Sequence, residues 1–443
     1  MAEAVVGGPD GEQTGPAESM HPTGMGTFDS LRVRNFRLLL IGTTLANAAQ
    51  WIQQVTLGWL VYDLTGSGTA LGSLNLVRSI ATVGLAPFSG VAIDRWSRRS
   101  LMIAINVWLL LASLVLGLVL LAGHQQVWYL FLFTFLGGIA QAFDMPLRQT
   151  IVFVMVPRAL AGNAVALIQT GWGLMRSIGP AAGGLLIVLF GPGGNFLVMA
   201  LAYGLIGLNI LRLSFPPQEA TPGRPALLQN LKEGLRYVIK EPTTRTFVLM
   251  GWLLPLLIVP NYVALPPIYA KTEFEGGPEV LGLLLSSVGI GGIVGGLVAA
   301  SLGRVDRRGL VQTGALLLLS LTLIGFALSR ALWLATLFFA VSGFFEMIFL
   351  TSNQTLLQLS IPDELRGRVT SITTLTAGLS PLGAMIAGAG ADLVGPRLMT
   401  LIFCSLVAVI SILVLLFVPL VREYRLSGVM RRETIFTSSS ARA

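Results

Sequence analysis

The feature that most restricts the fold of this chain is a series of long apolar segments separated by short polar loops. Twelve such segments can be counted, each of about 20 residues or more. A helix needs about 20 apolar residues to cross roughly 30 Å of hydrocarbon, where its backbone groups must hydrogen-bond to one another. The sequence therefore predicts an all-α membrane protein with twelve transmembrane helices. The segments are residues 36–62, 69–93, 100–122, 127–155, 162–190, 194–215, 244–270, 279–302, 309–329, 331–360, 367–391 and 396–421.

Composition agrees with this fold class and argues against several functions. Of 443 residues, 54% are hydrophobic and 11% are charged, whereas soluble domains carry roughly 25% charged residues. The single cysteine, Cys404, and the two histidines, His21 and His124, form no spacing typical of a metal site or a disulfide. We therefore expect no metal, no cofactor and no enzymatic activity. The net charge of +8 comes from loop arginines, so we expect no nucleic-acid partner.

The arginines also predict the orientation in the membrane. Of the Lys and Arg residues in loops and tails, nearly all fall in one alternating set of loops, and the opposite set holds only Lys271, Arg330 and Arg397. Because basic residues accumulate in cytoplasmic loops, both termini and the long middle loop are predicted to be cytoplasmic. We expect a multi-pass protein of the cell membrane, and since two six-helix halves need no partner chain, a monomer.

The chain divides into five parts. Residues 1–30 are rich in Gly and Pro and predict a disordered cytoplasmic tail. Residues 31–215 and 244–421 each hold six apolar segments, and residues 422–443 form a second cytoplasmic tail. The linker at 216–243 begins with prolines and continues with a helical apolar stripe, which predicts a short amphipathic helix on the inner membrane surface.

Two arginine clusters and several other matches indicate an internal duplication. The first cluster lies in the stretch Gly90–Arg99, between the second and third segments, and the second lies 209 residues later. Pro157 and Pro362 likewise follow the fourth and tenth segments at equivalent positions. Internal repeats are common in secondary transporters, so we predict two pseudo-symmetric six-helix bundles. The paired arginines are Arg95, Arg98 and Arg99 in the first half, and Arg304, Arg307 and Arg308 in the second.

Four stretches of the sequence resemble the major facilitator superfamily. The residues Gly90, Asp94, Arg95, Arg98 and Arg99 resemble that family's loop Gly-x-x-x-Asp-Arg-x-x-Arg-Arg. A second stretch, in the fifth segment, resembles the antiporter motif Gly-Pro-x-x-Gly-Gly, found mainly in exporters. Two further stretches resemble the branch that holds macrolide-efflux proteins and the enterobactin exporter. The antiporter motif comprises Gly179, Pro180, Gly183 and Gly184, and the further stretches are Asp63–Ser67 and Pro362–Arg368.

The resemblance implies a gate on the cytoplasmic side. Asp94 and Arg95 would hold the two halves together there while the cavity faces outward. A carboxylate at the start of the eleventh helix would also be stabilised by the helix dipole. The alternative interpretation is that these arginines only set the orientation of the chain.

Five charged residues lie well inside apolar segments and are candidates for function, because a charge is costly in hydrocarbon. Asp144 and Arg148 are spaced for an ion pair on one helical face, which fits either a structural or a functional role. Glu346 has no basic residue one turn away on its own helix. A carboxyl group in such a setting takes up protons more readily, so Glu346 is the first candidate for proton coupling and Asp144 the second. Alternatively, Glu346 forms a static ion pair with Arg78 or Arg176.

The chain also departs from the family. Many proton-coupled exporters carry an arginine early in the fourth helix, in the pattern Arg-x-x-x-Gly. The corresponding stretch, Phe131–Gly137, has none. Arg176 or Arg78 would have to take its place.

A polar stripe on the first segment predicts the substrate cavity. Asn47, Gln50 and Gln54 recur at helical spacing, with Trp51 beside them, and this stripe faces either a cavity or another helix. Phe345 and Asn353 on the tenth segment are further candidates. Apolar walls with a few polar groups suit amphipathic ligands.

Together these features predict a secondary transporter that exports an amphipathic, drug-like small molecule in exchange for protons, by alternating access. Export of a siderophore or lipid-like metabolite, import, and a non-transporting sensor on the same fold are the alternatives. A membrane enzyme would need a nucleophile with its base or a metal cluster, and the segments contain neither pattern.

Overall fold

The computed structural model describes residues 28–215, 227–302, 305–362, 365, 368–369 and 378–422. Within these ranges the chain is almost wholly helical and has no strand. Nine helical stretches of the described part are long and apolar enough to cross a membrane. The predicted all-α membrane class is confirmed.

Three features relate these nine stretches to the twelve predicted segments. Helix α5 (Ala161–Leu211) contains both the fifth and the sixth segment, with a sharp bend at Gly191, whose φ of 69° suits glycine. Helix α1 (Arg34–Thr65) is long enough but carries the polar stripe, which lowers its hydropathy. Helix α14 (Leu379–Val394) is the described part of the eleventh segment. The described helices are thus consistent with twelve spans.

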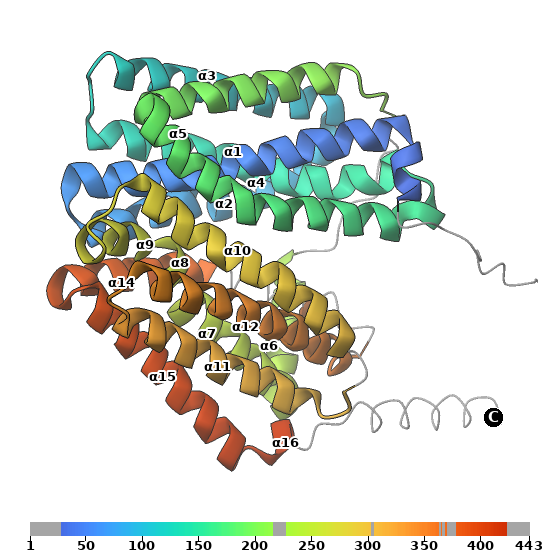
Figure 1. Ribbon diagram of the computed structural model, residues 1–443. Coiled ribbons are helices and arrows are strands. Elements are labelled where there is room, and N and C mark those ends of the chain that lie inside the picture. The colour runs from blue at the N-terminus through green and yellow to red at the C-terminus, as the bar shows by residue number, and fades with distance from the viewer. Residues whose placement is uncertain are drawn as a thin grey trace, which may run out of the picture.

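The helices form two bundles that lie against each other, the first half above the second in Figure 1. Helix α5 turns back on itself at Gly191 and therefore contributes two rods to the first bundle. The remaining helices of the first half are α2 (Gly68–Arg95), α3 (Arg98–Leu121) and α4 (Val127–Met155), and those of the second half are α10 (Pro278–Ser301), α11 (Arg308–Leu328), α12 (Leu332–Leu359), α15 (Pro396–Phe417) and the short α16 (Pro419–Arg422).

The two ends of the molecule differ in charge. At one end, which we call the arginine face, lie the end of α2, the start of α3, the end of α4 and the start of α11, with Arg95, Arg98, Arg158 and Arg308. At the other end, the opposite face, lie the end of α1, the start of α2 and the end of α14. Short 3₁₀ turns at Asp29–Arg32 and Arg158–Leu160 precede α1 and α5. Asp29 and Ser30, which the sequence places in the predicted tail at 1–30, belong to the first of these turns.

The seventh segment is not one regular helix. It consists of α7 (Pro242–Leu253), a π-helical turn, α8 (Pro260–Val263), α9 (Pro266–Ile268) and a second π-helical turn that ends at Glu273. Four prolines between 255 and 267 explain the breaks, because each removes a backbone donor and clashes with the preceding turn.

The predicted linker helix is present as α6 (Leu227–Lys240). It contacts the second half: Arg368 pairs with Glu233 at 2.8 Å, and the Tyr237 hydroxyl donates to the carbonyl of Ser360 at 3.3 Å. Val238 is buried, whereas Ile239 on the same turn is exposed. The linker helix is therefore held by protein contacts as well as by an amphipathic surface.

Glycines bring helices of the two halves into backbone contact. A Cβ atom on Gly289 of α10 would lie 2.6 Å from the Arg176 carbonyl of α5, and one on Gly282 would lie 2.6 Å from the Pro180 carbonyl. Small residues allow such an approach in lipid. The antiporter motif lies in this region: a Cβ on Gly179 would lie 2.7 Å from Cβ of Trp51 in α1. The motif residues Gly183 and Gly184 similarly meet Ile52 of α1 and Pro278 of α10.

The two halves also meet on the opposite face. The carboxylate of Asp392, at the end of α14, accepts hydrogen bonds from the start of α2: from Ser67 Oγ at 2.9 Å, Gly68 N at 2.5 Å, Thr69 N at 2.8 Å and Thr69 Oγ1 at 2.6 Å. A carboxylate at a helix N-terminus satisfies unpaired amide groups and interacts favourably with the helix dipole. These contacts close the opposite face.

The ionisation of Asp392 responds to these contacts. Partial burial raises the pKa of this carboxyl, but the hydrogen bonds from Thr69, Gly68 and Ser67 outweigh burial and hold the pKa below its ordinary value. The contact is therefore strongest when Asp392 is ionised, and it weakens as the pH falls through that lowered pKa.

The glycine contacts can be tested with two substitutions in one helix. Gly289→Ala should lower the stability of the purified protein by about 1–3 kcal/mol, because the new methyl group meets the backbone of α5. Gly296→Ala is the control, since nothing lies within 4 Å of its Cβ position. Thermal melting in detergent is the measurement. Equal melting temperatures for the two variants would contradict the close approach.

The Asp392 contact predicts a pH-dependent effect. Asp392→Asn should destabilise the protein by about 1 kcal/mol near pH 7, as expected for a lost helix cap. The difference from the unsubstituted chain should vanish once the pH falls below the lowered pKa of Asp392, since both side chains are then neutral. Glu275→Gln is the control, because Glu275 is an exposed acid near the same face. A melting difference that is independent of pH would argue against the ionised contact.

Candidate functional site

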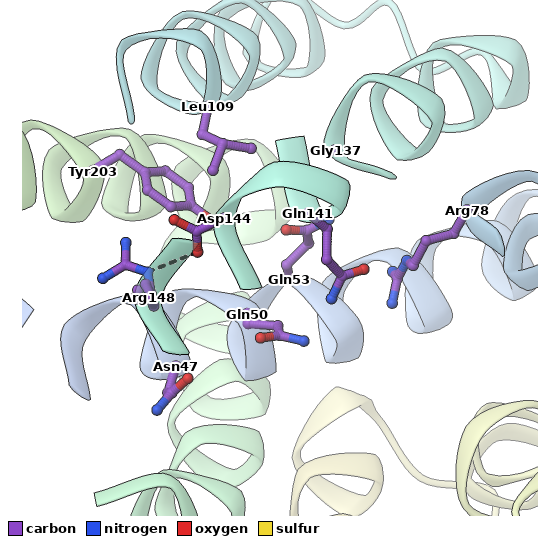
Figure 2. Close-up of a pocket in the computed structure, with 11 residues that line it drawn as sticks. Asn47, Gln50, Gln53, Arg78, Leu109, Gly137, Gln141, Asp144, Arg148 and Tyr203 are labelled. Atoms are coloured by element: carbon purple, nitrogen blue, oxygen red, sulfur yellow. Dashed lines mark hydrogen bonds and ion pairs between the residues drawn. The ribbon is translucent and has the colours of Figure 1, made fainter. Parts of the chain in front are cut away.

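A cavity opens between α1, α4 and α5 of the first half. Its larger part has a volume of about 640 Å³ and is lined by residues such as Asn47, Gln141 and Trp172. A smaller inner part of about 80 Å³ adds Gln53 and Arg78 and is shown in Figure 2. We call the two parts together the amide cavity. Six amide side chains line it: Asn47, Gln50, Gln53, Gln141, Gln149 and Gln169.

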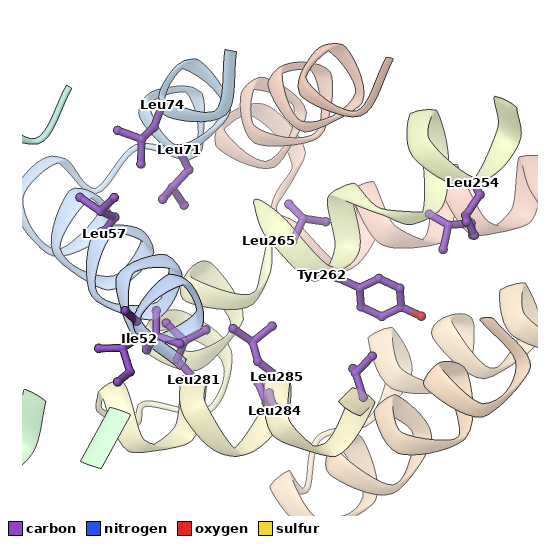
Figure 3. Packing of buried hydrophobic residues seen from close by; sticks show 14 of the residues in the cluster. Ile52, Leu57, Leu71, Leu74, Leu254, Tyr262, Leu265, Leu281, Leu284 and Leu285 are labelled. Atoms are coloured by element: carbon purple, nitrogen blue, oxygen red, sulfur yellow. The ribbon is translucent and has the colours of Figure 1, made fainter. Parts of the chain in front are cut away.

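The amide cavity extends from the middle of the bundle towards the arginine face. Phe153 and Val165, which line it, lie near the end of α4 and the start of α5 at that face. Towards the opposite face it gives way to dry packing. There Ile52 of α1 lies beside Leu281 of α10, and Leu57 of α1 lies towards Leu71 and Leu74 of α2, all buried (Figure 3). The cavity thus has an apolar floor that separates it from the opposite face.

The polar stripe of α1 supplies one wall of the cavity. Asn47 and Gln50 line it, as the sequence predicts, and Gln53 continues the row at a spacing of three. Gln54, our third candidate, is not among the lining residues. At about 100° per residue, position 54 lies within about 20° of Asn47, so Gln54 shares the face of the stripe and helix rotation alone does not account for its absence from the lining.

The predicted pair of Asp144 and Arg148 is present on α4. Arg148 Nε donates to Asp144 Oδ2 at 2.7 Å, and Arg148 Nη1 donates to Thr43 Oγ1 of α1 at 3.4 Å. Both charged side chains are largely buried and both line the cavity. The pair neutralises itself within one helix and so tolerates its apolar surroundings.

Glu346 is not the isolated carboxyl that its own helix suggested. Arg176 Nη2 of α5 donates to Glu346 Oε2 of α12 at 2.6 Å, with side-chain exposures of 11% and 7%. This ion pair joins the two halves in the middle of the molecule. The guanidinium of Arg176 also lies 5.6 Å from the ring of Trp172, which in turn contacts Trp51. Of the two sequence interpretations, the geometry agrees with the ion pair to Arg176.

Arg78 lies apart from both pairs. It comes from α2 and lines the inner part of the cavity, where Gln53 and Gln141 lie between it and the Asp144–Arg148 pair in Figure 2. Among the described residues it has no carboxylate within ion-pair distance, in contrast to Arg148 and Arg176.

Two candidates on α12 take part in packing rather than lining the amide cavity. Phe345 makes an edge contact with Phe344, and the amide oxygen of Asn353 accepts a hydrogen bond from Gln312 Nε2 at 2.6 Å. Trp51 likewise meets Gly179 and Trp172. The sequence positions of Phe345, Asn353 and Trp51 do not show whether these side chains face the cavity or a neighbouring helix.

The charged stretch between the second and third segments is shorter than the sequence suggested. Helix α2 includes Gly90, Asp94 and Arg95, and only Trp96 and Ser97 separate it from α3. Ser97 caps α3 by accepting from Ser100 N at 3.1 Å. Nothing in Gly90–Arg95 interrupts a helix, so the helix extends past the apolar segment to the arginine face.

The predicted gate residues differ in their surroundings. Arg99 donates to the carbonyl of Leu211 at 2.9 Å and so satisfies the end of α5 within its own half. Arg308 is buried at the start of α11, next to Arg307. Arg304 lies outside the described residues, and so does the start of the eleventh segment, against which Asp94 was expected to act.

Sequence reasoning missed four residues that the fold makes important. Gln53, Gln141 and Tyr203 line the cavity, and Asp392 joins the halves. For Gln53 and Gln141 the signal was available, since both are amides inside apolar segments. Asp392 is the one acid at the end of the eleventh segment, and its partner could not be inferred.

The pair of Arg176 and Glu346 predicts strong coupling in a double-mutant cycle. Arg176→Gln and Glu346→Gln should each lower the stability by about 3–5 kcal/mol, because each leaves a buried charge unpaired. The double variant should cost clearly less than the sum of the two. Melting of the four purified proteins measures this coupling.

The control cycle uses Lys271 and Asp63, which also pair across the two halves but are 38% and 44% exposed. An exposed pair should couple by less than about 1 kcal/mol. Additive effects at Arg176 and Glu346 would show that this pair does not act as a unit.

Comparison with known proteins agrees with this architecture. The chain is 28% identical over 405 residues to the multidrug efflux pump Tap of Mycolicibacterium fortuitum, covering 88% of this chain and 97% of that protein. It is 27% identical over 354 residues to the staphyloferrin A transporter of Staphylococcus aureus, covering 78% and 86%. Macrolide efflux protein A of Streptococcus pyogenes is 22% identical over 395 residues, covering 88% and 96%.

The fold is shared with solved transporters. A POT family transporter in complex with 5-aminolevulinic acid superimposes with a TM-score of 0.71, at 12% identity, covering 88% of this chain and 96% of the other. The sequence profile described as transmembrane secretion effector matches residues 25–431. The chain therefore belongs to the transmembrane secretion effector family of major facilitator exporters.

Proposed function

We propose that this protein exports an amphipathic small molecule across the cell membrane in exchange for protons, by alternating access between its two halves. The observation that carries the proposal is the position of the amide cavity. It extends towards the arginine face, while apolar packing and the Asp392 contacts close the opposite face. Such an arrangement is that of a transporter ready to take up its substrate from one side.

The arginine face is cytoplasmic in this proposal. Basic residues are retained on the cytoplasmic side of membrane proteins, and Arg95, Arg158 and Arg308 all lie at this face. The amide cavity is then loaded from the cytoplasm. Release outside requires the contacts of Asp392 with α2 to break and the arginine face to close.

The cavity lining suits an amphipathic substrate. Amide groups on one wall can donate and accept hydrogen bonds without carrying charge, and Val152, Phe153 and Ile168 provide apolar surface. Efflux pumps for drugs and macrolides are among the relatives of the chain. This mixture of few polar groups and apolar walls is typical of small-molecule sites.

Glu346 is the proposed proton carrier. It joins the halves through Arg176, so a proton on Glu346 would remove one charge of the pair and weaken the contact between α5 and α12. Because a buried unpaired charge is costly, protonation and movement of the two halves would be coupled. Asp144, already paired within α4, is the second candidate.

Export of a siderophore is the second candidate function. It is favoured by the similarity to the staphyloferrin A transporter over 78% of this chain. The same cavity and the same movement would serve either substrate.

Proteoliposomes with an imposed pH gradient test the proposal. Three amphipathic fluorophores of different charge form the panel: rhodamine 6G, Nile red and 1-pyrenebutyrate. At least one should accumulate in vesicles whose interior is acidic, and Glu346→Gln should reduce gradient-driven accumulation about 100-fold or more, the low end of the range for losing a proton-transfer group. Glu279→Gln is the control, since Glu279 lies in the first turn of α10 and its carboxylate accepts a hydrogen bond from Gly277 N, away from the amide cavity.

Each outcome has a clear meaning. If no fluorophore accumulates under any gradient, transport of amphipathic molecules is excluded. If Glu346→Gln accumulates the substrate as well as the unsubstituted chain, the ion pair with Arg176 is static and the proton assignment falls.

A further inference from the structure

The charges inside the bundle do not balance. Three arginines and two carboxylates lie in the middle zone of the described helices. Arg148 pairs with Asp144 at 2.7 Å, and Arg176 pairs with Glu346 at 2.6 Å. Arg78 is left over, so the amide cavity carries a net positive charge.

Arg78 is held in position by its backbone. A Cβ atom on Gly138 of α4 would lie 2.8 Å from the Arg78 carbonyl, so α2 and α4 are in direct contact at this point. The neighbouring Thr82 hydroxyl donates to the Arg78 carbonyl at 2.9 Å and also to the Gly138 carbonyl at 3.2 Å. The guanidinium is therefore presented to the cavity from a fixed point.

The groups that would attract a cationic substrate are already occupied. Asp144 is neutralised by Arg148, and Glu346 by Arg176. The ring of Trp172, which lines the cavity, lies 5.6 Å from the Arg176 guanidinium. Binding a cation would require one of these contacts to break.

In the described part of the chain, no carboxylate occupies the groups that would bind an anion. A guanidinium binds a carboxylate through two parallel hydrogen bonds, and these are among the strongest hydrogen bonds in proteins. Gln53 and Gln141 lie beside Arg78 in Figure 2, and their amide groups can add neutral donors. The remaining lining towards Phe153 and Ile168 can hold an apolar body.

We propose that the amide cavity selects amphipathic carboxylates, with the Arg78 guanidinium binding the carboxylate and the apolar wall holding the rest of the molecule. The proposal rests on the proposed transport function and specifies its substrate class. A charged side chain inside the membrane is costly and usually marks a functional site. An anionic substrate would supply the missing partner of Arg78. The bound carboxylate and Arg78 would then form a neutral pair inside the cavity.

Three pyrene derivatives of nearly equal size test the charge preference: 1-pyrenebutyrate, 1-pyrenebutanol and 1-pyrenebutylamine. Binding to the full chain in phosphatidylcholine nanodiscs is followed by energy transfer from tryptophan to pyrene, after subtraction of empty nanodiscs. The butyrate should bind about 10- to 100-fold more tightly than the alcohol, the range for a hydrogen bond to a charged group. The amine should bind more weakly than the alcohol.

Arg78→Gln should abolish the preference for the butyrate, and Arg78→Lys should keep part of it because the charge remains. Arg330→Gln, which removes an exposed arginine near the opposite face, is the control and should change nothing. Arg78→Gln should also melt no lower than the unsubstituted chain without ligand, because Arg78 has no acid partner to lose in the described structure.

Several results would overturn the proposal. They are equal binding of the butyrate and the amine, no saturable binding of the butyrate, an unchanged preference in Arg78→Gln, or a lower melting temperature for that variant. The binding assay needs no transport, so its failure is separate from failure of the flux assay. Flux of rhodamine 6G or Nile red without butyrate preference would leave the transport function intact and remove only this substrate class.

Discussion

The close contact of α10 with both α5 and α12 is the constraint on which the rest of the structure depends. Glycines on α10 allow it: Gly289 meets the backbone of α5, and Gly291 meets that of α12. Gly292 also leaves room for the Arg176 guanidinium, 3.9 Å from its Cβ position. Arg176 can therefore reach Glu346 past α10. Without side chains between these helices, a mid-membrane ion pair can join the two halves, in addition to their apolar packing and the polar contacts on the opposite face.

Two ion pairs neutralise all but one of the five charges inside the described bundle. In a medium of low dielectric, a buried charge needs a partner or access to water. Arg148 and Arg176 have partners on α4 and α12, and Arg78 instead faces the amide cavity. The amides of the lining soften this field without cancelling it. In the proposed selection of carboxylates, charge pairing thus decides which ligands the cavity favours, although the lining itself is mostly uncharged.

In the proposed cycle, different contacts close the two faces in turn. On the opposite face Asp392, at the end of α14, caps the start of α2. At the arginine face the related residue is Asp94, near the end of α2. Asp94 lies near the end of α2 and Asp392 near the end of α14, and these two helices pack against each other between the two faces. In the proposed cycle, contacts at the two faces alternate, and the central contact of α5 with α10 serves as the pivot.

Apolar segments, arginine asymmetry and helix breakers are local properties, so the sequence alone determined the membrane class, the helical content, the helix at 227–240 and the Asp144–Arg148 pair. The glycines of the Gly-Pro-x-x-Gly-Gly motif lie where helices approach closely, which the motif by itself does not say. Only the tertiary structure decided which residues face one another. The partner of Glu346 lies 170 positions away and that of Asp392 more than 320, and Gln53 lines the cavity where Gln54 was expected. Such choices depend on how helices are rotated and packed, which hydropathy does not encode.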